Sequence, residues 1–258
     1  MLRHARRAFS STQSPRVAIV GSGPGGFYTA KYLLRDSKDV QVTILDRWPT
    51  PFGLVRYGVA PDHPEVKSVQ DDFEEVATNE RFSYAGHVFV GHPADAPDHS
   101  GPVVPLNDLM NLYDAVVVAT GCDLPRSLDL PGAELDGVVN ARAFVGWYNG
   151  HPDFRDLDPH LGTENVVVIG NGNVAIDVAR VLVKTPEEMT EADLPRHVGE
   201  AIQESSVTDV FMVGRRGPVG AKFTNVELRE MGHLVDAHAI VDPDDLPDEV
   251  IGDWSDRD

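Results

Sequence analysis

Cysteine is almost absent from this chain of 258 residues, which contains only Cys122. A single thiol excludes a disulfide scaffold, a cysteine-ligated cluster and a redox-active CxxC pair. Long apolar runs are also missing: none approaches the roughly 18 residues that cross a bilayer, so the sequence predicts no transmembrane segment. Basic residues are scarce, with 22 Lys and Arg against 41 Asp and Glu and a formal net charge of −19. This acidic excess argues against nucleic acid and anionic membranes as partners.

Acidic residues are missing from the start of the chain, where the first is Asp36. Residues 1–15 are instead rich in serine and carry Arg3, Arg6 and Arg7, which is typical of an organellar transit peptide. We therefore predict a mitochondrial protein of the matrix or the inner-membrane surface. A plastid location and a plain disordered basic tail are the alternatives. From about residue 242 the chain is acidic and weakly apolar, which predicts loop or disorder.

Two glycine-rich turns are present, each directly after an apolar strand. The first is GSGPGG, with Gly21, Gly23 and Gly26 in the key positions, and the second is GNGNVA from Gly170. The first glycine allows the sharp turn, the second lets a pyrophosphate approach the backbone, and the third position must be small for helix and strand to pack. The phosphates then lie at the helix N-terminus. The pair predicts two dinucleotide sites.

The charge after the next strand distinguishes the two sites. The strand at 40–45 ends at Asp46, 20 residues after Gly26, where an acid hydrogen-bonds an adenosine ribose. A carboxylate repels a 2′-phosphate, so this site should bind FAD or NAD. The strand at 207–213 is followed by Arg215 and Arg216, which suit the 2′-phosphate of NADP.

Strands that alternate with helices predict the α/β class, with two Rossmann-like, doubly wound parallel-sheet domains. We expect a transit peptide at 1–15, the first part of an FAD-binding domain at 16–131 and an NADP-binding domain at 132–258. Both domains are expected to be incomplete at the C-terminus, because only one candidate strand, 234–241, follows the arginines.

Smaller elements are also predicted. We expect a strand at 115–121 that closes the first sheet and a helix at 141–148 that opens the second domain. Residues 185–205 read as a helical insertion interrupted by Pro186 and Pro195.

Longer stretches resemble the adrenodoxin reductase type of ferredoxin–NADP reductase, a family of mitochondrial and actinobacterial flavoenzymes. The resemblance covers about residues 16–235. Its matching stretches are VAIVGSGPGGFYTAKYLL from Val17, PFGLVRYGVAPDHPEVK from Pro51, YDAVVVATG from Tyr113, ARAFVGWYNG from Ala141, VVVIGNGNVAIDVAR from Val166 and VGRRGP from Val213.

The resemblance implies roles for individual residues. Arg215 and Arg216 would bind the 2′-phosphate of NADP(H), and His63 and Glu227 are the catalytic candidates, near the flavin and the nicotinamide respectively. A structural loop histidine and a solvated helix acid are the alternatives for these two. No metal ligand is implied. The other implied cofactor contacts are Gly21, Gly23, Gly25, Gly26, Asp46, Leu54 and Val90 for FAD, and Asn171, Gly172, Asn173, Val174 and Glu227 for NADP(H).

The resemblance also implies a function: electrons would pass from NADPH through FAD to a [2Fe–2S] ferredoxin similar to adrenodoxin. Related folds pass electrons to a redox-active CxxC pair, and the lack of such a pair here argues against disulfide-reductase activity. Two alternatives stay open. An NADPH-dependent flavin monooxygenase shares the two Rossmann turns and the use of NADPH, and a non-catalytic nucleotide-binding fragment is possible because the later portion of the family has no counterpart here. The sequence does not predict an oligomeric state.

Overall fold

The computed structural model describes residues 14–98, 100–122, 125, 129–189, 192–215, 217, 220–242 and 246. These residues form two compact units. Unit 1 consists of residues 14–59 and 65–122, whereas unit 2 consists of residues 60–64 and those described from 125 onward. Arg216, most of the expected transit peptide and most of the acidic tail lie outside the described residues.

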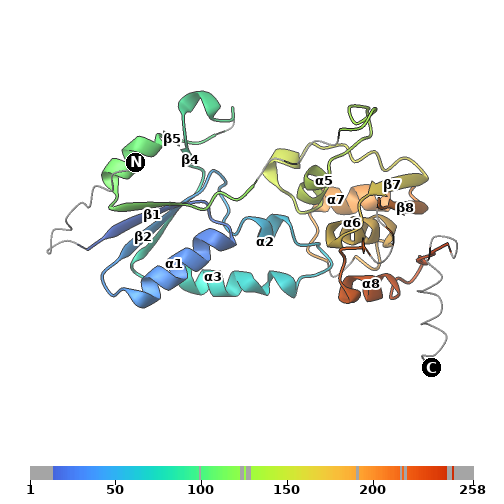
Figure 1. Ribbon diagram of the computed structural model, residues 1–258, viewed down its shortest axis with the longest axis horizontal. Helices are drawn as coiled ribbons and strands as arrows, with labels where there is room; N and C mark the ends of the chain where they lie inside the picture. The colour runs from blue at the N-terminus through green and yellow to red at the C-terminus, as the bar shows by residue number, and fades with distance from the viewer. Residues whose placement is uncertain are drawn as a thin grey trace. The chain divides into compact units, whose positions relative to one another are not determined.

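Unit 1 is built on a parallel four-stranded sheet in the order β3-β2-β1-β6 (Figure 1). A separate short parallel pair joins β4 and β5. The strands are β1 (Arg16–Val20), β2 (Gln41–Leu45), β3 (Phe82–Ala85), β4 (Phe89–Val90), β5 (Val103–Val104) and β6 (Ala115–Val118). The expected strand at 115–121 is therefore present but ends at Val118.

Helices cover both faces of this sheet. They are α1 (Pro24–Asp36), α2 (Leu54–Tyr57), α3 (Val69–Ala77) and α4 (Leu106–Leu112), with short 3-10 turns η1 (Val66–Ser68) and η2 (Pro93–Asp95). Helices α1 and α3 lie side by side along one face (Figure 1). Leu109 of α4 packs against the opposite face with Ala18 and Val20.

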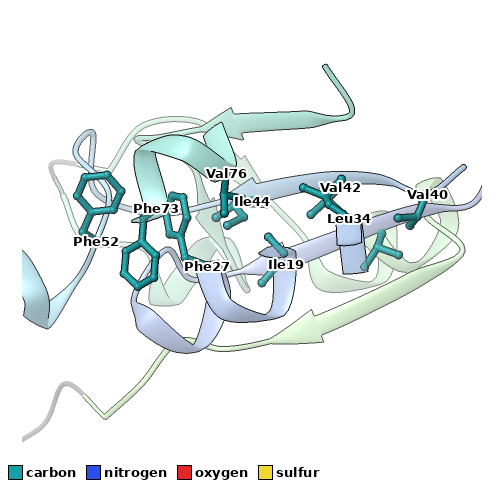
Figure 2. Packing of buried hydrophobic residues seen from close by; sticks show 11 residues of the cluster. Ile19, Phe27, Leu34, Val40, Val42, Ile44, Phe52, Phe73 and Val76 are labelled. Carbon is teal, nitrogen blue, oxygen red and sulfur yellow. The ribbon is translucent and has the colours of Figure 1, made fainter. Parts of the chain in front are cut away.

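Alternation along β1 and β2 directs Ile19, Val42 and Ile44 into the main core of unit 1. Phe27 lies at the centre of this core, with its ring centroid 5.0 Å from that of Phe73. Figure 2 shows these side chains between the sheet and the helices. The first glycine turn therefore sits at the end of a strand that is fixed on both faces.

Unit 2 is built around a parallel pair of strands, β7 (Asn165–Ile169) and β8 (Asp209–Val213). One face of the pair packs against helices through Val166, Val168 and Val210. The other face is half-exposed, with Val167 at 58% and Phe211 at 52%. The remaining elements are α5 (Ala141–Tyr148), η3 (Pro152–Phe154), α6 (Asn173–Val183), α7 (Arg196–Gln203) and α8 (Asn225–Met231).

The predicted α/β class with Rossmann-like parallel sheets is confirmed. The helix at 141–148 is present as α5, and the insertion at 185–205 contains α7, which begins after Pro195. Among the described residues, no helix is long and apolar enough to cross a membrane.

The prediction of a strand at 234–241 is wrong. These residues follow α8 as turn and irregular chain. Leu234 is buried, but Ile240 is 89% exposed. A strand persists only where a neighbouring strand completes its backbone hydrogen bonds, and no pairing with this segment occurs in the described part of the chain.

Candidate cofactor sites

The first glycine turn has a backbone that other residues could not adopt. Gly21 has φ of +108°, and a Cβ there would lie 2.3 Å from the Ala119 carbonyl oxygen. A Cβ on Gly26 would lie 2.0 Å from the carbonyl oxygen of Gly21. Gly23 precedes α1 without any side-chain cap, and Gly25 is exposed in the first helical turn. The turn thus leaves an accessible helix N-terminus, which fits a pyrophosphate.

Asp46 lies directly after β2 and contacts this turn. Its Oδ2 accepts hydrogen bonds from the Ser22 amide at 2.7 Å and the Ser22 hydroxyl at 2.6 Å. Its Oδ1 accepts one from the Trp48 amide at 2.8 Å. A carboxylate offers about four acceptor positions, so the hydrogen bonds from the described residues leave one position on Oδ1. Burial, followed by the negative charge of Asp46, raises the pKa of the nearby Tyr84 hydroxyl to about 12.

The other two expected FAD contacts border the same end of the sheet. Leu54 begins α2 and is half-exposed. A Cβ on the preceding Gly53 would lie 2.8 Å from Cα of Gly23, so the start of α2 is tight against the turn. Val90 of β4 packs on the cluster that contains Val20, the last residue of β1. Unit 1 therefore brings its expected FAD residues to one edge.

The second turn, in unit 2, is more open. Gly172 precedes α6 without a side-chain cap, and a Cβ there would meet nothing within 4 Å. The Asn171 carbonyl accepts from the Lys222 amide at 2.9 Å, and Asn173 Oδ1 accepts from the Thr224 amide at 2.9 Å. Val174 is half-exposed at the start of the helix. These bonds fix the turn and leave its N-terminal amides accessible to phosphate.

Arg215 is exposed just after β8. The adjacent Gly214 is close to the turn, because a Cβ there would lie 2.8 Å from the Asn171 Cβ. The structure therefore places Arg215 one residue from a position that is close to the second turn. Its expected companion, Arg216, lies outside the described residues.

A buried group of charged side chains in unit 2 was missed by sequence reasoning. We call it the Arg180 cluster; its members are Asp62, His63, Asp177, Arg180, Lys184, Glu227 and Glu230. They come from residues 60–64, from α6 and its C-cap residue Lys184, and from α8. The stretch VVVIGNGNVAIDVAR contains its central arginine, but an arginine within an apolar helix was the only available signal.

Arg180 is at the centre of this cluster, with its side chain 2% exposed. Its Nε and Nη2 donate to the two carboxylate oxygens of Asp62 at 2.6 and 3.2 Å. Nη2 also donates to Asp177 at 2.9 Å, and Nη1 to Glu230 at 2.9 Å. Lys184 donates to Asp62 at 2.7 Å.

The two catalytic candidates belong to the same cluster. The His63 Nε2 atom is 3.0 Å from Glu230 Oε2. The capping residue Thr224 accepts from the Glu227 amide at the start of α8, and Glu227 Oε2 is 3.6 Å from Arg180 Nη1. The structure therefore brings His63 and Glu227 together within unit 2.

The environment of the cluster shifts the pKa values of its carboxyl groups in opposite directions. Burial alone would raise the pKa of Asp62, but hydrogen bonds and charges from Arg180 and Lys184 lower it to about 2. Burial raises the pKa of Asp177 despite Arg180. Burial, followed by the charges of Asp177 and Glu230, also raises the pKa of Glu227. Asp62 is thus the committed anion, whereas Glu227 binds a proton more readily than an exposed glutamate.

Ligand atoms of His63, Glu227 and Glu230 all lie within 4.8 Å of one another, close enough for a metal ion. However, Glu230 Oε2 already accepts a hydrogen bond from the Arg180 guanidinium. A cation next to that oxygen would be repelled by the arginine, so this arrangement favours an internal ion pair.

Two glycine turns at the ends of parallel strands, each opening an uncapped helix, define a Rossmann-type dinucleotide-binding protein. The chain belongs to the pyridine nucleotide-disulphide oxidoreductase family, whose model matches residues 15–208. It is 46% identical to the human protein named NADPH:adrenodoxin oxidoreductase, mitochondrial, over 238 residues, which are 92% of this chain and 46% of that protein. The resemblance drawn from the sequence motifs is confirmed.

A bacterial relative is similar to almost the same degree. The chain is 43% identical to NADPH-ferredoxin reductase FprA of Mycobacterium tuberculosis over 235 residues, 89% of this chain and 49% of that protein. A solved structure of this FprA in complex with NADPH matches with a TM-score of 0.85 and 39% identity, covering 95% of this chain and 57% of that chain. The chain thus spans about half the length of the curated relatives it matches.

Proposed function

We propose that this chain binds FAD at residues 21–26 and NADP(H) at residues 170–175, and passes electrons from NADPH to a [2Fe–2S] ferredoxin. The observation that carries the proposal is the opposite charge beside the two turns. Asp46 offers a negative acceptor with one position left on Oδ1, whereas Arg215 presents an exposed guanidinium. Names of the relatives that mention NADPH, adrenodoxin and ferredoxin support the choice of cofactor and partner.

Each cofactor has its own set of residues in this proposal. Gly21, Gly23, Gly25, Gly26, Asp46, Leu54 and Val90 would hold FAD, and Asn171, Gly172, Asn173, Val174, Arg215 and Arg216 would hold NADP(H). A flavin supplies hydride acceptance and single-electron release. The protein contributes position and charge: Asp46 would orient the ribose, and Arg215 would select the 2′-phosphate.

His63, near the flavin, and Glu227, at the nicotinamide end, are the proposed catalytic residues. Burial raises the pKa of Glu227, so this carboxyl would take up a proton more readily than an exposed glutamate. His63 is the other titratable group in the cluster suited to proton movement near neutral pH.

The cofactor assignment can be tested by titrating the purified chain with FAD, NADPH and NADH. We expect a bound-flavin absorbance spectrum and a preference for NADPH that falls by about tenfold to a hundredfold in Arg215→Ala, because one charge-assisted contact is worth about 1.5 to 3 kcal/mol. Arg196→Ala is the matched control, since Arg196 lies in the same unit with its side chain 92% exposed. A chain that fails to retain FAD, or that binds NADH equally well, would refute the assignment.

Electron delivery needs a separate assay. Ferredoxin-dependent reduction of cytochrome c by NADPH would support the proposal. Oxygen-coupled hydroxylation with little cytochrome c reduction would favour a flavin monooxygenase. FAD and NADPH binding without bleaching of the flavin would identify a nucleotide-binding chain without catalysis.

We also propose a mitochondrial location and the domain limits 16–131 and 132–258. The arginine- and serine-rich residues 1–15 support the location. A fluorescent protein fused after residue 15 should enter mitochondria, and the same fusion with Arg3, Arg6 and Arg7 replaced by glutamine should not. Entry of both fusions, or of neither, would contradict the assignment.

A further inference from the structure

We infer that Arg180 positions the catalytic candidate His63 by holding it from two sides. On the backbone side, the guanidinium pairs with Asp62, the residue just before His63. On the ring side, it binds the same Glu230 oxygen that contacts His63. The inference rests on the proposed function only in calling His63 a catalytic candidate, because the geometry lies entirely within unit 2.

On the backbone side of His63, Arg180 and Asp62 form a bidentate ion pair that is buried from solvent. Arg180 Nε and Nη2 reach separate oxygens of Asp62, whose side chain is 4% exposed. Two backbone hydrogen bonds also hold the segment 60–64. The Asp193 amide donates to the Pro61 carbonyl at 3.0 Å, and the His63 amide donates to the Ala60 carbonyl at 3.0 Å. With Asp62 fixed, the Cα of His63 has little freedom.

The ring side depends on one shared atom. Glu230 Oε2 lies 2.9 Å from Arg180 Nη1 and 3.0 Å from His63 Nε2. A carboxylate on a helix surface would normally have several rotamers. The guanidinium restricts Glu230 to the one that reaches the imidazole. The contact with His63 Nε2 has ion-pair distance without hydrogen-bond geometry, so Glu230 acts on the ring by placing a carboxylate charge beside it.

Lysine could not perform the same task. Arg180 uses three nitrogens in one plane to reach Asp62, Asp177 and Glu230. An ammonium is a single point of charge on a flexible stem, so it can pair with one carboxylate but cannot hold Asp62 and Glu230 at fixed relative positions. Lys184, which already pairs with Asp62 alone, illustrates the difference.

The test uses the full chain with ¹⁵N-labelled histidine and uniformly ¹⁵N-labelled backbone. In Arg180→Lys, we expect the His63 ring resonance, assigned with His63→Gln, to move from its wild-type position. The His63 amide should exchange with solvent at least about tenfold faster, because its segment opens locally. The ring resonance of His151, which is buried in the same unit, and the exchange of the Val181 amide in α6 should stay within about twofold of wild type.

Two further variants complete the design. Arg196→Lys, an exposed arginine of unit 2 paired with Glu200, should leave the His63 signals unchanged. Asp62→Asn removes only the backbone side, so it should speed exchange of the His63 amide more than it moves the ring resonance. If Arg180→Lys does not fold, Asp62→Asn decides the matter through the His63 amide.

Unchanged His63 signals in folded Arg180→Lys would overturn the inference. Equal changes at His63, His151 and Val181 would also overturn it, because they would indicate general destabilisation. Addition of NADPH to the same samples separates the two proposals. If NADPH moves no resonance while Arg180→Lys still displaces His63, the positioning role stands and the proposed function fails.

Discussion

Acid should weaken unit 2 through Asp62, and the replacement Asp62→Asn should expose the effect. The pKa of Asp62 is lowered from 3.8 to about 2 in the folded chain. At about 1.4 kcal/mol per pKa unit, this difference stabilises the folded state by roughly 2.5 kcal/mol at neutral pH. A depressed carboxyl pKa gives stability that is present above the unfolded pKa and lost as pH falls through the folded one. About half of the contribution should remain at pH 3.

Neighbouring carboxyl groups act in the opposite direction. The pKa values of Asp177 and Glu227 are raised by burial, so the folded state binds their protons more tightly and acid stabilises it through these two groups. The pH dependence of the total unfolding free energy therefore combines contributions of opposite sign. The informative quantity is the difference in unfolding free energy between wild type and Asp62→Asn, since Asp177 and Glu227 are present in both chains.

This difference should be largest at pH 7 and smaller by about 1 kcal/mol at pH 3, where the Asp62 carboxyl is largely protonated in the unfolded chain but still mostly ionised in the folded one. Urea unfolding can follow unit 2 through the buried Trp147, in a chain where Trp48 and Trp254 are replaced by phenylalanine. Asp72→Asn, which removes an exposed carboxylate paired with Lys31 in unit 1, is the control for loss of a charge outside the unit that Trp147 reports on. A constant difference from pH 7 to pH 3 would refute the view of Asp62 as a buried anion.

Two other predictions concern the addition of a Cβ atom at a glycine and the removal of a buried hydroxyl group. Gly26→Ala should destabilise unit 1 by about 1 to 3 kcal/mol and abolish FAD retention, because its Cβ would collide with a backbone oxygen; Gly172→Ala has open space and should lower NADPH affinity with an unfolding midpoint close to wild type. Tyr148→Phe should be neutral or slightly stabilising by urea denaturation, because the buried Tyr148 hydroxyl has no hydrogen-bond partner among the described residues. A loss above about 1 kcal/mol would show that this hydroxyl is satisfied after all.

Most of the fold could be predicted because its signals are local. The apolar runs 17–20 and 166–169, each followed by glycine, correspond to β1 and β7 within one residue. The glycines themselves predict the turns because no Cβ fits at Gly21 or Gly26. The failed strand at 234–241 shows the limit of this reasoning, because strand formation depends on a partner elsewhere in the chain that no local pattern reveals.

The candidate site residues also differ in whether a local sequence signal predicts them. Asp46 and Arg215 could be placed because each follows a strand whose end is fixed by a nearby turn. The Arg180 cluster could not, since its central pairs join residues 118 and 50 positions apart. No sequence pattern assigned a role to Asp62, and none linked Glu227 with His63. In the structure, the Arg180 guanidinium contacts Glu227 and binds both Asp62 and Glu230, the two residues next to His63.

Two aspartates show how the same side chain serves different ends in this chain. Asp62 is surrounded by the cations of Arg180 and Lys184, so its charge is neutralised inside the protein and it has structural work only. Asp46 is held by neutral donors, the amides of Ser22 and Trp48 and one hydroxyl, which orient the carboxylate without cancelling its charge. In the proposed FAD site this charge would repel a phosphate on the adenosine ribose, whereas the glycine turn itself would bind the pyrophosphate. The proposed selectivity would therefore depend on the neutrality of the Asp46 donors as much as on the aspartate itself.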